Sequence, residues 1–141
     1  MSIRRTRTKA AALLLAPLLL VGGVQGDGEP YVCSLTGAVE CDGDLNCGAP
    51  ALEQPTPTFI HVDHEAGLIT LLAPAERRGE ATQIDASVRD GDRMIMSGVE
   101  AGRGWTLSLS ETEGSAVMTV NLGDAAYVAV GQCIASGLLW P

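Results

Sequence analysis

The sequence contains one lysine, Lys9, and only 4% aromatic residues among its 141 positions. After position 26 its basic residues are five scattered arginines, so it has no basic patch of the kind that holds a nucleic-acid backbone. Its longest apolar run, residues 10–21, is shorter than the roughly 20 residues that span a bilayer. We therefore expect neither a nucleic-acid partner nor a membrane-spanning helix.

Motifs typical of catalysis are also missing. The chain has no G-x-S-x-G nucleophile elbow and no C-x-x-C pair. The two histidines, His61 and His64, flank Asp63, and this segment is the basis of one alternative, a hydrolase. On a strand, however, His61 and Asp63 share a face while His64 lies opposite or in the following turn, which is more typical of a solvated strand edge. We expect a protein that is not an enzyme and has no cofactor.

The first 26 residues have the three parts of a secretory signal peptide. Four basic residues between Arg4 and Lys9 precede the apolar run at 10–21, and small residues follow as far as Gly26. We predict cleavage after Gly26 and export to the bacterial periplasm or beyond, with no membrane attachment afterwards. Residues 27–141 then form a single β domain, because 115 residues suffice for one modest core.

The exported part of the chain is strongly acidic. All 17 acidic residues remain after position 26 against five basic ones, which gives a formal net charge of −12. Such a charge keeps a small domain soluble and attracts cations. A basic protein or a small ligand is accordingly the expected kind of partner.

Apolar and polar residues alternate with period two from position 58 onward, which is typical of half-buried strands. Clusters of Gly and Asp, as at 90–92, separate the runs and predict tight turns. The expected strands are 58–63, 68–72, 82–89, 93–97, 105–110, 116–122 and 127–133, with a further one near 31–35.

Seven or eight consecutive strands of this kind predict an all-β, antiparallel up-and-down meander. A meander of that size buries its apolar face by closing into a small barrel or by folding into a two-layer sandwich. A cysteine-rich segment and connector at 27–57 precede the meander at 58–133, and an apolar tail follows at 134–141. Two longer loops are expected, at 73–81 and 98–104.

The four cysteines are Cys33, Cys41, Cys47 and Cys133. An even number of cysteines in an exported chain predicts disulfides, and three pairings are possible. If the strand near position 31 and the last strand are neighbours, Cys33 and Cys133 come within bonding distance and Cys41 and Cys47 close a local loop. We prefer this pairing.

One short segment has the oxygen-ligand spacing of a calcium loop, formed by Asp42, Asp44, Asn46 and Glu53. Its position 6 is Cys47 where the loop needs glycine, and no helix is expected on either side. The segment is therefore a weak calcium alternative beside the simpler interpretation of an acidic turn.

The expected loops at 73–81 and 98–104 concentrate the remaining candidate binding residues: Arg77, Arg78, Glu100, Arg103 and Trp105. Arginine recognises carboxylates and other anions, and loops carried by a rigid sheet often form binding sites. The function favoured by the sequence is a non-catalytic binding or interaction domain that acts through these two loops.

The series Tyr31-Val32-Cys33, Cys41, Cys47, Gly104 to Ser108 and Gly131-Gln132-Cys133 resembles a group of small exported proteobacterial proteins of unknown function. That resemblance implies a periplasmic β domain and assigns no site. The order of cysteines and strands is also similar to that of the periplasmic inhibitors of c-type lysozyme. Those barrels insert a loop with Ser-Gly into the lysozyme cleft, which implies a corresponding role here for a loop opening at Ser97-Gly98.

Overall fold

The computed structural model describes residues 28–139, so the predicted signal peptide and the last two residues lie outside the described part. The fold is all-β, as the alternating pattern predicted. Its elements are β1 (Tyr31–Asp42), β2 (Cys47–Gly48), β3 (Phe59–Asp63), β4 (Leu68–Ala73), the 3₁₀ helix η1 (Ala75–Arg77), β5 (Ala81–Gln83), β6 (Ala86–Asp90), β7 (Arg93–Glu100), β8 (Arg103–Ser110), β9 (Ser115–Asn121), β10 (Ala125–Ala135) and the 3₁₀ helix η2 (Ser136–Leu139).

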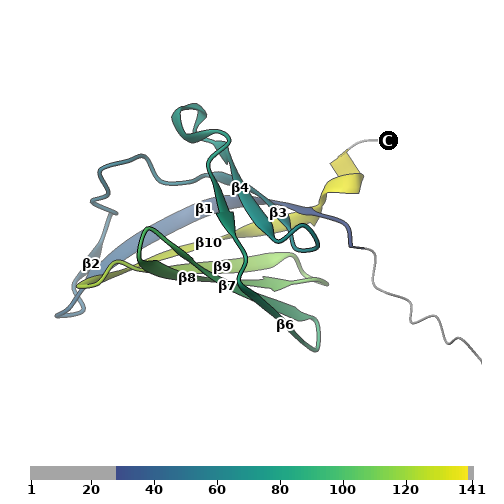
Figure 1. The fold of residues 1–141 in the computed structure, drawn as a ribbon. Helices are drawn as coiled ribbons and strands as arrows, with labels where there is room; N and C mark the ends of the chain where they lie inside the picture. The colour runs from purple at the N-terminus through teal and green to yellow at the C-terminus, as the bar shows by residue number, and fades with distance from the viewer. Residues whose placement is uncertain (1–27, 140–141) are drawn as a thin grey trace, which may run out of the picture.

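The strands form one antiparallel sheet in the order β5-β4-β3-β1-β10-β9-β8-β7-β6, with β2 paired only to β1. Apart from the short β2 between β1 and β3, neighbours in this order are consecutive along the chain, except that β1 pairs with the last strand, β10. The predicted up-and-down meander is thereby confirmed, and the sheet curls into a half-barrel in which β1 and β10 run side by side (Figure 1).

The two ends of the sheet approach each other where the chain passes from β5 to β6. The amide of Ile84 donates to the carbonyl of Gly67 before β4, and the next amide, of Asp85, donates to Ser97 in β7. The expected continuous strand 82–89 is thus wrong in one respect, because the chain changes partners at these two residues. All five residues of β6 are exposed, so this part of the expected strand is not half-buried as the alternating pattern predicted.

The core occupies the inner face of the curled sheet. Its largest fully buried aliphatic and methionine side chains come from alternate positions of β3, β4, β7 and β8: Ile60, Val62, Ile69, Met94, Met96, Leu107 and Leu109. Burial of each such side chain stabilises the fold by about 1.5–3 kcal/mol. One end of the inner face is filled by this cluster, and the other end is open.

Two disulfides cross-link neighbouring strands, and both have the preferred pairing. Cys33 in β1 faces Cys133 in β10 directly across the ladder, and the two sulfurs are bonded. Cys41 pairs with Cys47 across the short β1–β2 hairpin. Disulfides are typical of an oxidising compartment, so the two bridges indicate a non-cytoplasmic location.

The segment 98–104 is not the loop that the sequence predicted. Strand β7 continues to Glu100 and β8 begins at Arg103, so the turn consists of Ala101 and Gly102 alone. Both have positive φ, 50° and 76°, which is the geometry of a tight type I′ hairpin. Ser97 and Gly98 consequently lie inside a paired strand, and Gly98 is buried.

Breaking the Cys33–Cys133 bridge is expected to cost more stability than breaking Cys41–Cys47. The bridges close loops with sequence separations of 100 and 6 residues. In the chain-entropy estimate the long one is worth about 4 to 5 kcal/mol and the short one about 2 to 3. Urea denaturation of C33A/C133A and C41A/C47A measures both losses. Equal losses would contradict the assignment of the long bridge as the main covalent constraint.

A carboxylate in the turn between β6 and β7 supports the neighbouring hairpin. Asp92 Oδ2 accepts hydrogen bonds from Ser110 Oγ at 2.9 Å and Thr112 Oγ1 at 2.8 Å. The bond from Thr112, followed by that from Ser110, holds the pKa of Asp92 below its ordinary value. The ionised form is therefore favoured by folding.

This lowered pKa predicts a specific acid dependence of stability. The contribution of Asp92 is fully present above its unfolded-state pKa of about 4 and is lost as the pH falls through the lower folded-state pKa. In D92N the urea midpoint should therefore change less between pH 5 and pH 2 than in the unmodified protein. D90N, which alters a neighbouring exposed carboxylate, is the matched control. An equally reduced change of the urea midpoint with pH in D92N and D90N would refute the prediction.

Candidate functional site

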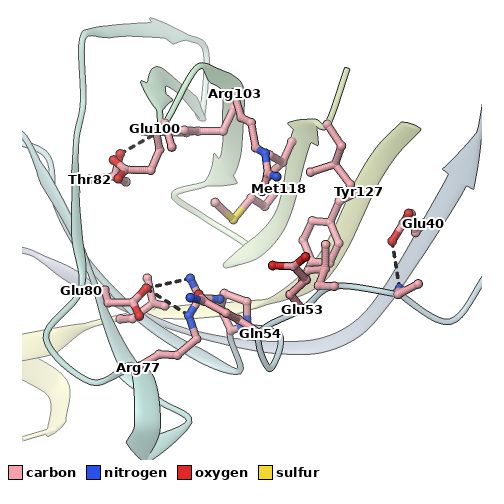
Figure 2. Close-up of a pocket in the computed structure, with 18 of the residues that line it drawn as sticks. Glu40, Glu53, Gln54, Arg77, Glu80, Thr82, Glu100, Arg103, Met118 and Tyr127 are labelled. Carbon is pink, nitrogen blue, oxygen red and sulfur yellow. Dashed lines mark hydrogen bonds and ion pairs between the residues drawn. The ribbon is translucent and has the colours of Figure 1, made fainter. Parts of the chain in front are cut away.

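The open end of the half-barrel forms a cleft of about 730 Å³. Its walls come from the connector before β3, from the η1–β5 segment and from the β7–β8 hairpin, while β9 and β10 supply the floor (Figure 2). The cleft is lined by Glu40, Ala51, Leu52, Glu53, Gln54, Pro57, Leu71, Arg77, Glu80, Ala81, Thr82, Glu100, Ala101, Arg103, Trp105, Met118, Val120, Leu122, Asp124 and Tyr127.

The phase of the strands explains why charged groups line this interior. In β7 the inward positions run Met94, Met96, Gly98 and then Glu100, and in β8 the inward row that contains Trp105 begins with Arg103. At the open end of the half-barrel, the β7–β8 hairpin therefore places Glu100 and Arg103 in the same inward-facing rows as the core residues. Figure 2 shows Arg103 extending into the cleft toward Met118.

Arg77 fixes the wall formed by η1 and β5. Its guanidinium donates from Nε and Nη2 to Glu80 Oε2, the latter over 2.7 Å, and from Nη1 to the carbonyl of Pro55 at 3.0 Å. The hydrogen bonds from Arg77 lower the pKa of Glu80. Across the cleft, Glu40 Oε2 accepts from the amide of Ala51 at 2.9 Å. The connector is thus attached at two points to the rim.

Trp105 joins the two walls beneath the mouth. Its indole Nε1 donates to Thr82 Oγ1 of β5 at 3.2 Å, and the side chain is only 4% exposed. A Cβ at position 98 would overlap the Trp105 ring and the carbonyl of Gln83, so only glycine allows β5 to approach β7 this closely. Trp105 consequently acts in the packing of the cleft rather than as an exposed contact.

Tyr127 carries the most unusual polar group of the site. Its side chain is 3% exposed, and its hydroxyl has no hydrogen-bond partner in the part of the chain that the structure describes. Burial raises the pKa of Tyr127, an effect that the nearby positive charge of Arg77 opposes. An unpaired buried hydroxyl is costly, so it marks a position where a ligand atom would gain a hydrogen bond.

The structure brings together four of the five candidate binding residues. Arg77, Arg103 and Trp105 line the same cleft, as does Glu100. Arg78 does not line it, because its Nε donates to the carbonyl of Leu72 and its side chain turns away. The two segments predicted as binding loops do face each other, although one of them is a strand hairpin.

The sequence interpretation missed the floor and the connector. The sequence pattern places Tyr127 and Met118 on strands and Leu52 in a linker, and all three line the cleft. The alternating pattern does indicate that Met118 and Tyr127 face inward, because both lie at the apolar positions of their strands. The position of the connector carried no such signal.

The histidine segment does not form a catalytic cluster. His61 and Asp63 share the outer face of β3, and Asp63 accepts a hydrogen bond from the amide of Ala66 in the following turn. The buried Nδ1 of His64 has no partner within residues 28–139, and its ring centroid lies 6.4 Å from that of Tyr31. Nothing in this arrangement connects a carboxylate to either imidazole.

The calcium alternative receives no geometric support. Asp42 Oδ1 accepts the amides of Asp44 and Asn46, both at 2.9 Å, so its carboxylate stabilises the turn. Glu53 lines the cleft instead. Among residues 28–139 no group of three or more His, Cys, Asp or Glu side chains lies close enough together to hold a metal ion.

Comparisons with known proteins assign no relative. No protein-family model matches the chain, and no curated protein or solved structure matches it significantly. Within residues 28–139 no helix is long and apolar enough to cross a membrane.

Removing the Tyr127 hydroxyl is expected to leave the protein as stable as before or to stabilise it by about 1 kcal/mol, because that hydroxyl is buried without a partner. T82V, which removes the acceptor of the Trp105 indole, should instead lower the free energy of unfolding by about 1 kcal/mol. Urea denaturation of Y127F and T82V tests the contrast. A loss of stability in Y127F would show that the hydroxyl is hydrogen-bonded in solution.

Proposed function

We propose that this protein is an exported, non-catalytic binding domain of the periplasm or extracellular space that takes a small ligand in the cleft. The observation that carries the proposal is the convergence of the η1–β5 segment and the β7–β8 hairpin on one concavity. A volume of about 730 Å³ suits a small organic molecule, since ligand pockets commonly measure about 300–1,000 Å³.

A small ligand is favoured over the basic protein partner that the acidic charge also suggested. A stable protein interface needs about 800 Å² on each side, and such surfaces are usually broad. The polar groups here instead converge on a concave floor that contains Tyr127 and Met118.

Neither alternative function gains a supporting observation. For lysozyme inhibition, Ser97 and Gly98 pair with Thr106 and Trp105 inside the sheet, so they do not form a protruding loop. For a hydrolase, His61 and Asp63 lie on the outer face of β3, away from the cleft.

The proposal predicts that filling the cleft abolishes ligand capture. Ala51 and Ala81 are exposed and line the cleft, so the variant A51W/A81W should occupy its volume with two indoles. In equilibrium dialysis against a bacterial small-molecule extract, mass spectrometry should find compounds enriched by the unmodified protein and lost from this variant.

The matched control is A66W/A86W, whose two sites are exposed and lie outside the cleft. Near-ultraviolet circular dichroism checks that both variants are folded. Equal enrichment by the two variants, or enrichment of no compound by the unmodified protein, would refute the proposed function.

A further inference from the structure

The cleft has an excess of negative charge. Two arginines line it, Arg77 and Arg103, against five carboxylates: Glu40, Glu53, Glu80, Glu100 and Asp124. Two of the carboxylates are already engaged, since Glu80 binds Arg77 and Glu40 accepts the amide of Ala51.

The remaining charges are available to a ligand. Within residues 28–139, no hydrogen bond or ion pair engages the charged groups of Glu53, Glu100, Asp124 or Arg103. These four groups carry three negative charges and one positive charge. A cation entering this rim gains attraction from three carboxylates, whereas an anion is repelled by them and attracted by one guanidinium. The acidic surface of the whole domain adds to the same preference.

The floor beneath this rim is apolar. The half-buried side chains of Met118, Val120 and Leu122 line it, and Leu52 of the connector packs against the core beside them. Removing apolar ligand surface from water against such a floor is favourable. A purely polar cation, such as a hydrated metal ion, would leave this surface unused.

The hydroxyl of Tyr127 is an independent sign that the cleft takes a ligand. It is buried and unpaired among the described residues, and it belongs to a side chain that lines the cleft. A polar atom on the apolar body of a ligand would satisfy it. This group distinguishes the site from an acidic surface patch, whose carboxylates are fully hydrated.

We infer that the ligand is a small organic cation, an ammonium or guanidinium group joined to an apolar aliphatic or aromatic body that carries a hydrogen-bonding atom. This inference rests on the proposed function and specifies the ligand class of the same cleft. The cationic group lies among Glu53, Glu100 and Asp124, and the body covers the floor toward Tyr127.

Three probes of similar shape test the charge preference: tyramine as the cation, 4-hydroxyphenethyl alcohol as the neutral compound and 3-(4-hydroxyphenyl)propionate as the anion. Titration of isotope-labelled protein is followed by NMR at the Trp105 indole and at the amides of Ala81 and Leu122, which line the cleft. Tyramine should shift these signals at millimolar concentration and bind more tightly than the other two probes.

Isosteric variants then locate the cation. E53Q/E100Q/D124N should weaken tyramine about tenfold, since exposed ion pairs are individually weak but add together. E65Q/E76Q/E113Q removes the same charge at exposed positions outside the cleft and should leave binding nearly unchanged. Y127F should weaken tyramine severalfold without lowering stability, because it removes only an unpaired hydroxyl.

Each contrary result has a separate meaning. Equal or tighter binding of the anion at the cleft would overturn the cationic ligand class while leaving a binding function intact. Equal weakening by the two triple variants would show that only long-range charge matters, which also overturns the inference. If no probe shifts a cleft signal, the inference fails, and the dialysis experiment with A51W/A81W then decides the proposed function independently.

Discussion

The pairing of β1 with β10 is the interaction on which the rest of the structure depends. Strands β3 to β5 are attached to the sheet through β1, and β6 to β9 through β10, so this one ladder holds the two halves together. Cys33 and Cys133 lie in register within it and make the connection covalent. Because the two walls of the cleft belong to different halves, their separation is set by this ladder and by the contact of β5 with β7.

Incomplete closure is what gives this small domain a cleft. The backbone passes between the two sheet ends at Ile84 and Asp85, and the inner face is sealed by apolar side chains at one end and remains open at the other. At the open end the inward rows continue with Glu100 and Arg103, which need access to water because unpaired charges are not buried in an apolar core. The same opening is the entrance for the proposed ligand.

Polar groups at this end fall into two classes. Arg77, Glu80 and Glu40 hold the walls and the connector in place through hydrogen bonds within the protein. Glu53, Asp124 and the hydroxyl of Tyr127 contribute no such bond within residues 28–139. A stable fold seldom leaves a buried hydroxyl unpaired unless its position serves another purpose, so the second class points to binding and the first to architecture.

The sequence by itself determined the strand class and the meander order, because period-two alternation and short Gly and Asp turns are local signals. It predicted two disulfides but left three pairings possible, because the pairing depends on β1 and β10 being neighbours in the sheet. It also placed Arg77 and Arg103 among the candidate residues, but it treated 98–104 as a loop, since three glycines there suggest irregular backbone. Only the tertiary structure decided that this segment is a hairpin with Glu100 and Arg103 in the inward phase. The approach of β5 to β7 over Gly98, the docking of Leu52 and the unpaired hydroxyl of Tyr127 depend on contacts between residues far apart in the chain, and no local pattern encodes how far a curled sheet closes.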